Sequence, residues 1–274
     1  MAGGDSGSAG RAFTQYTMTA FTNSSESKMF VYDSTDGANF RPVGGGHAYS
    51  PPAGLVRDPS MMRHLDGWYY LVYTTGWDGN TIGFARSRDR VHWDFLRNFT
   101  MPIRGAAHTW APVWFLDDGR VSFIVSVSTG GPFLPYLFTA TDPALTNWTA
   151  PTQLLGIGPN YIDTIVIRTG AIYHAFTKNE TTKFVEHAVG PTAVGPFLFV
   201  GLGNWAGWGA PREGQSIIHL DNGGWRIFLD GYTIGKYFYS DSHDGFLTWS
   251  PPRELPGLSG HVRHFTVLKE LARR

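Results

Sequence analysis

The chain has 274 residues, and its 22 Lys and Arg residues balance its 22 Asp and Glu residues, so the formal net charge is zero. This balance argues against a nucleic-acid-binding protein or a polybasic membrane-surface protein, both of which need an excess of basic residues. The absence of cysteine excludes disulfides, thiolate metal sites and cysteine nucleophiles. No apolar run approaches the roughly 20 residues that span a bilayer.

The first eleven residues are rich in Gly and Ser and predict a flexible N-terminal tail without the apolar segment of a signal peptide. Four Asn-x-Ser/Thr sequons follow, at Asn23, Asn98, Asn147 and Asn179. They favour a secreted, N-glycosylated protein whose signal peptide is absent from this numbering. Chance occurrence in a Thr-rich β protein is the alternative explanation.

From residue 12 onward, short strand patterns recur about every fifty residues. A glycine turn followed by an alternating aromatic and β-branched strand occurs at Gly67, Gly119, Gly170 and Gly223, with spacings of 52, 51 and 53. An Asp-bearing turn followed by an aromatic residue closes most units, at Asp36, Asp89, Asp142 and Asp244. Short strands with a period near fifty are typical of propeller blades.

A third element, a short apolar strand, precedes each glycine turn. These strands open at Asp58, Trp110, Asp163, Glu213 and His264, with steps of 52, 53, 50 and 51. The last of them has no outer strands after it, whereas residues 16–40 supply outer strands without an inner one. The sequence therefore predicts an all-β, five-bladed β-propeller over residues 12–274, with one blade completed by N-terminal strands plus the C-terminal strand.

Two further expectations concern secondary structure. A β-sandwich also has regular short strands, but it explains neither the fifty-residue period nor the repeat divided between the two ends. Helical periodicity is nearly absent, and only residues 268–274 are predicted to form a short helix.

In a propeller the first strand of each blade lines the central channel, so the five strand-opening residues should converge at one mouth. Three carboxylates there repel one another and resist desolvation. For a single Asp a hydrogen bond at the strand end would be the favoured explanation, but three acids indicate a functional site. Strand alternation predicts that Arg57 and Arg212 point away from the acids that follow them.

Two carboxyl groups on opposite sides of a pocket are the minimum requirement for glycoside hydrolysis, one protonated as acid and one ionised as base or nucleophile. Asp58 and Glu213 lie three blades apart in one direction and two in the other, so we expect them to face each other across the pocket. Indole rings stack on the C–H faces of sugars. Among Trp77, Trp110, Trp205 and Trp208, which fall in loops or at strand starts, Trp110 is the strongest candidate, because most aromatic residues must pack between blades.

The sequence resembles family 43 glycoside hydrolases, five-bladed propellers that act on arabinose-, xylose- and galactose-containing polysaccharides. The likeness covers residues 16–270 and rests on motifs in five successive blades, namely Arg57-Asp58-Pro59-Ser60, His108-Thr-Trp110-Ala-Pro112, Tyr161-Ile-Asp163, Glu213-Gly214 and Arg263-His264. The resemblance implies that Asp58 is the general base, that Glu213 is the general acid, and that Asp163 tunes the pKa and orientation of the acid.

The resemblance also bears on substrate and metal binding. The predicted substrate-binding residues are His108, Trp110, Trp77, Tyr232 and His264. No cofactor is expected to be required. A structural calcium or sodium ion is expected near His264, held through water, because the family's histidine at this position often lies near such an ion.

Val113, Thr164 and Phe265 depart from the family motifs, which affects the expected subsite specificity and metal site more than the acids. The second-blade motif and Lys178-Asn-Glu-Thr are most similar to exo-acting α-L-arabinofuranosidases. The resemblance thus implies an inverting enzyme with a carbohydrate substrate. A monomer with no nucleic-acid or membrane partner is expected.

Other functions stay open. A β-xylosidase or a galactofuranosidase of the same family is an alternative. A retaining β-fructofuranosidase would carry Asn-Asp-Pro, but the Asp-Pro pairs here, at Asp58 and Asp142, are not preceded by Asn. A non-catalytic propeller lectin would have no reason to place three acids at the channel mouth.

Overall fold

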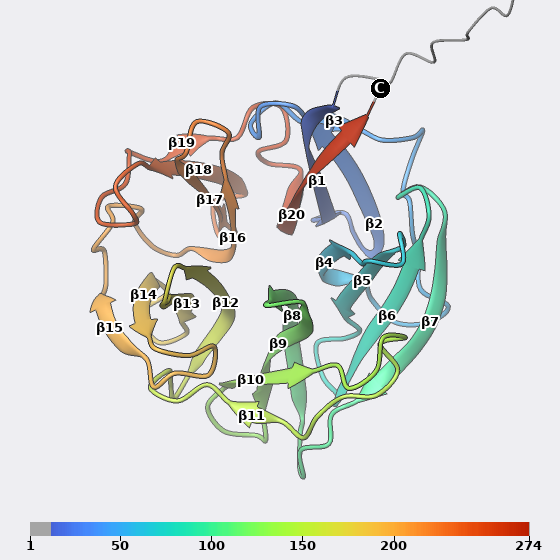
Figure 1. Cartoon of the computed structure of the whole chain (residues 1–274), viewed down its shortest axis with the longest axis horizontal. Helices are drawn as coiled ribbons and strands as arrows, with labels where there is room; N and C mark the ends of the chain where they lie inside the picture. Colours follow the sequence, from blue (N-terminus) through green and yellow to red (C-terminus); the bar gives the residue numbers. More distant parts are fainter. Residues whose placement is uncertain (1–11, 274) are drawn as a thin grey trace, which may run out of the picture.

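The computed structural model describes residues 12–273, so the predicted tail over residues 1–11 lies outside the described residues. The described chain forms twenty strands in five antiparallel four-stranded sheets, which surround a common centre (Figure 1). The predicted five-bladed β-propeller is confirmed. In the part of the chain that the structure describes, no helix is long and apolar enough to cross a membrane.

Four of the blades follow one another along the chain. The first consists of β4 (Arg57–Arg63), β5 (Tyr69–Thr74), β6 (Thr81–Ser87) and β7 (Trp93–Thr100). The second consists of β8 (His108–Asp117), β9 (Arg120–Ser128), β10 (Leu134–Thr139) and β11 (Thr152–Gln153). The third consists of β12 (Tyr161–Thr169), β13 (Ile172–Asn179), β14 (Val185–Gly190) and β15 (Leu198–Gly201). The fourth consists of β16 (Glu213–His219), β17 (Trp225–Gly231), β18 (Lys236–Ser242) and β19 (Arg253–Glu254).

The fifth blade joins the two ends of the chain, as predicted. Its outer strands are β1 (Ala12–Thr22), β2 (Ser25–Ser34) and β3 (Arg41–Pro42), and its inner strand is β20 (Val262–Arg273). Strands β1 and β20 run antiparallel, with Thr19 opposite Thr266. In Figure 1 the red strand β20 accordingly lies beside the blue strand β1.

The predicted helix over residues 268–274 is wrong. Leu268 to Arg273 continue β20 and pair with β1, with Leu268 opposite Thr17, and Arg274 lies outside the described residues. A seven-residue helix is marginal by itself because nucleation is unfavourable. Pairing with β1 satisfies the backbone hydrogen bonds of the segment and closes the ring.

The turns follow the sequence signals. Gly67, which separates the first two strands of its blade, has a backbone φ of 83°, a region that glycine adopts without steric cost. In the Asp-bearing turns the carboxylate accepts backbone hydrogen bonds. Asp36, for example, accepts from the N–H groups of Ala38 and Asn39 at 2.9 and 2.8 Å.

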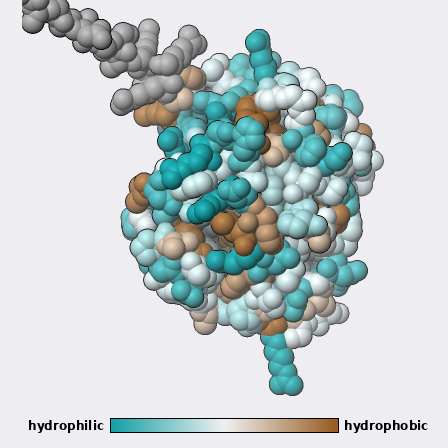
Figure 2. All heavy atoms as spheres, turned by 90° about the vertical axis from the view of Figure 1, so that its right-hand side faces the viewer, coloured by the Kyte–Doolittle hydropathy of each residue, from teal (hydrophilic) through white to brown (hydrophobic). Residues whose placement is uncertain are grey.

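The hydrophobic core is divided into five clusters, and each fills the space between two neighbouring blades. Strand β5 shows why: Tyr70 and Val72 face the second blade, whereas Leu71 and Tyr73 face the fifth. Successive side chains of a strand point to opposite faces, so a strand buried on both faces reads as continuously apolar. On the face of the molecule drawn in Figure 2, hydrophobic and hydrophilic residues are intermingled.

Candidate active site

Every inner strand contains a β-bulge at the same place. The pairing register with the neighbouring strand shifts after Arg57, Trp110, Ile162 and Glu213 in four blades, and at the corresponding point of β20 in the fifth. The residue at each bulge has a positive φ, with 49° at Asp58, 50° at Ala111, 56° at Asp163, 57° at Gly214 and 24° at His264. A bulge inserts one residue and re-aims the side chains around it.

These bulges correct the predicted register. The structurally equivalent residues are Asp58, Ala111, Asp163, Gly214 and His264, so Trp110 and Glu213 each stand one position earlier than the sequence alignment of the repeats placed them. The three acids therefore occupy two different positions along the inner strands, here called levels. Asp58 and Asp163 lie at the bulge itself. Glu213 lies one residue before the bulge, at the same level as Arg57, Trp110, Ile162 and Arg263.

The bulge also overturns the expectation for Arg57. Simple alternation would send Arg57 and Asp58 to opposite faces, but the left-handed residue interrupts the alternation and both line one cavity. Arg57 forms an ion pair with Glu26, and its guanidinium lies 3.8 Å from the centre of the Trp77 ring. Arg212 does turn away, and its guanidinium lies over the ring of Phe238.

One cavity of about 320 Å³ contains all three predicted catalytic acids. It lies at the mouth formed by the starts of the inner strands. Its lining is Arg57, Asp58, Trp77, Trp110, Ile162, Asp163, Lys178, Glu180, Glu213, Tyr232, Arg263 and His264. Four of the five predicted substrate-binding residues, Trp77, Trp110, Tyr232 and His264, are therefore in place.

The fifth, His108, does not line this cavity. Its Nδ1 lies 3.2 Å from the carbonyl oxygen of Trp77, and its ring packs 5.7 Å from that of Trp110, so it supports the two indoles instead of facing the cavity. Trp205 and Trp208 pack between the third and fourth blades. The Trp77 and Trp110 rings pack edge to face with their centres 6.0 Å apart and form an aromatic wall of the cavity.

Asp58 is buried and held by a hydrogen bond and an ion pair. Thr74 donates to Oδ2 at 2.7 Å, and Nδ1 of His264 lies 3.1 Å from Oδ1. Burial opposes the ionisation of Asp58, but His264, Arg57 and Thr74 together hold its pKa well below the ordinary value. Burial likewise opposes the charge of His264, and the carboxylates of Asp58 and Asp163 raise its pKa to about 9. An imidazolium–carboxylate pair is therefore the resting state near neutral pH.

Asp163 differs from Asp58. Burial raises the pKa of Asp163 to about 6, the carboxylates of Glu213 and Asp58 act in the same direction, and His264 and Lys178 oppose them. Its Oδ2 accepts a hydrogen bond from the Gly214 N–H at 3.0 Å. Gly214 is required here, since a Cβ would lie 2.8 Å from the His264 ring. Asp163 thus fixes the backbone next to Glu213 while repelling its carboxylate.

Glu213 is held by two cations that were not among the predicted site residues. Lys178 Nζ lies 2.8 Å from Oε2, and an Arg263 Nη lies 3.1 Å from Oε1. Lys178, Glu180 and Arg263 all belong to the sequence motifs, but none of them was predicted as a site residue. One signal was available for Lys178: it continues an otherwise buried strand, β13, and buried lysines require partners.

The residues around His264 do not fit a directly bound cation. The Nδ1 atom faces Asp58, and an imidazolium has no free lone pair for a metal. No group of three His, Asp or Glu side chains among residues 12–273 is arranged to hold a metal ion. The structural ion expected near His264, held through water, stays a prediction.

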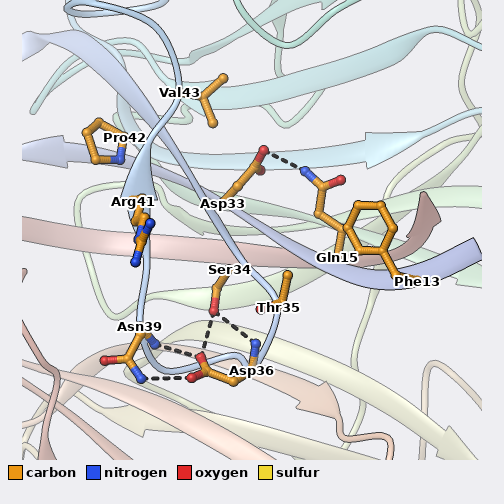
Figure 3. A pocket seen from close by; sticks show the side chains of 10 residues that line it. All are labelled: Phe13, Gln15, Asp33, Ser34, Thr35, Asp36, Asn39, Arg41, Pro42 and Val43. Atoms are coloured by element: carbon orange, nitrogen blue, oxygen red, sulfur yellow. Dashed lines mark hydrogen bonds between the residues drawn. The ribbon is translucent and has the colours of Figure 1, made fainter. Parts of the chain in front are cut away.

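A larger cavity, of about 800 Å³, lies away from the three predicted catalytic acids, on the fifth blade against β1, β2 and β3 (Figure 3). Several of its polar residues hydrogen-bond to one another. Gln15 donates to Asp33 at 2.5 Å, and Ser34 and Asn39 hydrogen-bond to Asp36. This cavity has no indole ring, and its two acids, Asp33 and Asp36, are not buried.

The channel-mouth cavity thus combines a buried ionised carboxylate, two further acids that repel each other and a wall of indole rings. Comparison with known proteins agrees with this chemistry. A family related to glycosyl hydrolase family 43, described as "Probable glycosyl hydrolase domain", matches residues 11–269. The chain belongs to this family.

Among curated proteins, this family-43-related chain is 28% identical to an alpha-L-arabinofuranosidase of Bifidobacterium longum, with 73% of this chain and 24% of the relative aligned. It is 26% identical to a vacuolar acid beta-fructofuranosidase 1 of a Rosa hybrid cultivar, with 77% of this chain and 42% of the relative aligned. The chain therefore spans less than half the length of either relative.

Solved structures share the fold. An endo-1,4-beta-xylanase of Bacteroides thetaiotaomicron superposes with a TM-score of 0.66 at 15% identity, covering 89% of this chain and 96% of the other. An alpha-L-arabinofuranosidase of Lactobacillus brevis gives 0.52 at 17% identity, covering 72% and 73%. The family-43-related chain is thus similar in architecture to enzymes with different named activities.

Proposed function

We propose that this chain is an inverting glycoside hydrolase that removes arabinofuranosyl units from plant-type polysaccharides or oligosaccharides. The observation that carries the proposal is the gathering of Asp58, Asp163 and Glu213 in one cavity with Trp77 and Trp110. Paired carboxyl groups and stacking aromatic rings are what glycoside hydrolysis and sugar binding require.

Asp58 is assigned as the general base. Its hydrogen bond from Thr74 and its pairing with His264 favour the ionised form, which accepts a proton from the attacking water. Glu213 is assigned as the general acid that protonates the leaving oxygen. Asp163 touches neither reacting atom in this assignment, and it acts by orienting the Glu213 backbone through Gly214 and by repelling the Glu213 carboxylate.

The arabinofuranosyl specificity is supported by two similar proteins and by the size of the cavity. The relative from Bifidobacterium longum and the structure from Lactobacillus brevis both carry the name alpha-L-arabinofuranosidase. A cavity of about 320 Å³ lies at the small end of the roughly 300–1,000 Å³ of ligand pockets, which favours capture of a terminal sugar and hence exo action. A β-xylosidase or galactofuranosidase specificity is the alternative within the family.

A retaining β-fructofuranosidase is the second candidate, favoured by the similarity to the Rosa enzyme. The two candidates differ in stereochemistry. An inverting enzyme keeps its carboxyl groups roughly 6.5–9.5 Å apart so that water fits between them, whereas a retaining enzyme brings them to roughly 5–5.5 Å. A lectin is disfavoured because a binding site alone gains nothing from three clustered acids.

The deciding experiment measures the release of nitrophenol from arabinofuranoside, xyloside and galactofuranoside substrates and the hydrolysis of sucrose. Proton NMR of the first product then reports its anomeric configuration. We expect turnover of the arabinofuranoside with inversion. Retention would overturn the inverting assignment, preferential sucrose hydrolysis would support the fructofuranosidase, and sugar binding without any turnover would indicate a lectin.

We further propose a secreted, monomeric protein that is N-glycosylated at a subset of its sequons. Asn98 and Asn147 are exposed, whereas Asn179 is half-buried and donates a hydrogen bond to the Tyr161 hydroxyl at 3.1 Å. We expect glycans at Asn98 and Asn147 but not at Asn179. Mass spectrometry of the protein produced in a eukaryotic host would test this expectation.

A further inference from the structure

Lys178 is the most deeply buried cation of the cavity, with only 2% of its surface exposed. Its Nζ lies 2.8 Å from Glu213 Oε2 and 2.9 Å from Glu180 Oε2, and it stands 4.7 Å from the centre of the Tyr232 ring. We infer that Lys178 is a positioning residue that holds Oε2 of Glu213, so that Oε1 carries the proton donated to the leaving group. This inference rests on the proposed function.

Arg263 contacts the other oxygen of Glu213 but is committed elsewhere. Its Nε donates to Asp230 Oδ2 at 2.6 Å, one Nη donates to Asn23 Oδ1 at 2.8 Å, and the contact with Glu213 Oε1 is longer, at 3.1 Å. Oε1 is therefore the less tightly held oxygen. A protonated Oε1 can still accept from Arg263 through a lone pair while its hydrogen points at a substrate.

The positive charge of Lys178 also lies next to the carboxyl group on which negative charge develops during the reaction. When Glu213 acts, its Oε1–H bond breaks, the proton joins the glycosidic oxygen, and the electron pair of the sugar C–O bond leaves with that oxygen. The attacking water forms the new C–O bond and gives its proton to Asp58. Glu213 is left as a carboxylate, and a fixed ammonium 2.8 Å from Oε2 stabilises that product more than the neutral acid.

The surroundings keep the ammonium in place. Glu180 forms an ion pair with Lys178 through Oε2 and accepts a hydrogen bond from Lys183 through Oε1, so the carboxylate of Glu180 joins a buried cation to a more exposed one. Lys183 contacts Glu180, and its side chain keeps 36% of its surface exposed. Lys183 is thus a matched control, because its removal takes away one lysine charge of the same network without touching Glu213.

The test compares two aryl glycosides of whichever sugar the wild type hydrolyses, one with a dinitrophenolate and one with a methylphenolate leaving group. The first departs without proton donation, whereas the second needs the acid. General-acid assistance contributes about 10²–10⁴-fold, so Lys178→Met should cost at least about tenfold in kcat/KM on the methylphenyl substrate and less than about threefold on the dinitrophenyl one. Lys183→Met should change neither rate more than about twofold.

The pH profile supplies a second readout. Removing the ammonium disfavours deprotonation of the acid, so the high-pH limb of kcat/KM in Lys178→Met should move to higher pH, while Lys183→Met keeps the wild-type limb. If Lys178→Met does not fold, as judged by circular dichroism, Lys178→Gln keeps hydrogen-bond donors without charge and should show the same pattern. Lys178→Arg should recover part of the methylphenyl rate.

The outcomes separate the two proposals. Equal losses on both leaving groups with an unmoved pH profile would overturn the role of Lys178, while leaving the hydrolase assignment intact. Absence of wild-type turnover on every glycoside would overturn the proposed function and the role of Lys178 with it. A selective loss on the methylphenyl substrate supports both.

Discussion

The Nδ1 atom of His264 lies 3.1 Å from Oδ1 of Asp58, although the two residues are 206 positions apart in the chain. Asp58 is the second residue of β4 in the first blade, and His264 lies near the start of β20, which completes the fifth blade beside it. The pair therefore forms only when the ring closes. Folding of the two ends into one blade is what assembles this side of the cavity.

The assigned acid and base can be removed singly. Asp58→Asn and Glu213→Gln should each lower kcat/KM by about 10²–10⁴-fold, because each deletes one proton transfer. The far-ultraviolet circular dichroism should stay that of the wild type. Glu254→Gln, which removes an exposed carboxylate paired with Lys236, is the control and should retain full activity. Activity within a few-fold of wild type in either variant would refute the assignment.

Asp163→Asn should lower activity and move the pH limb that reports the general acid to lower pH. The reason is that the Asp163 carboxylate repels that of Glu213, so its neutralisation makes deprotonation of the acid easier. The pKa of Asp163 itself is raised to about 6, chiefly by burial. A full profile of kcat/KM against pH decides the matter, and an unmoved limb would show that Asp163 acts through backbone orientation alone.

The His264 pair should make stability fall at alkaline pH. The pKa of His264 is raised to about 9 in the folded protein from roughly 6.5 in an unfolded chain. The folded state thus binds more protons than the unfolded state between these values, and the free energy of unfolding decreases as pH rises through this window. Urea unfolding at pH 6.5 and 9.5 measures the decrease, and His264→Asn should flatten it.

A second histidine pair should act at acid pH. His174 Nδ1 lies 3.0 Å from His187 Nε2, and His187 stacks on Phe176 with ring centres 4.4 Å apart. Burial lowers the pKa of His187 to about 3, so the unfolded state binds more protons between about pH 3 and 6.5 and stability falls as pH falls through this range. His187→Phe should reduce that slope, whereas His47→Gln, at an exposed histidine, should leave it unchanged.

Trp77 is half exposed, with 51% of its surface accessible, and its indole ring is held in place by Glu26 and Arg57. Its Nε1 donates to Glu26 Oε2 at 3.1 Å, and Arg57 stacks on its ring. Trp77→Ala should raise KM for an oligosaccharide about tenfold with little change in kcat, since stacking of roughly 1 kcal/mol or more is lost. Trp77→Phe retains a ring and should recover most of the affinity. A fall in kcat alone would contradict a binding role.

The sequence by itself determined the five-bladed architecture and identified the three acids that line the channel-mouth cavity. A period near fifty residues, with outer strands at one end and an inner strand at the other, admits one closed arrangement of five blades, because a blade cannot bury its apolar faces alone. Asp58, Asp163 and Glu213 were recognisable because ionisable residues at the starts of buried strands are costly unless they serve a purpose.

Only the tertiary structure decided how those residues are arranged in the cavity. A single left-handed residue per inner strand, at Asp58 for instance, interrupts the two-residue alternation, so Arg57 joins the cavity and Glu213 moves one level from Asp163. Lys178 reaches Glu213 across 35 residues of sequence. Periodicity describes repeats within a strand, whereas bulges and inter-blade contacts depend on backbone conformation and on neighbours that are remote in the chain, which no local pattern records.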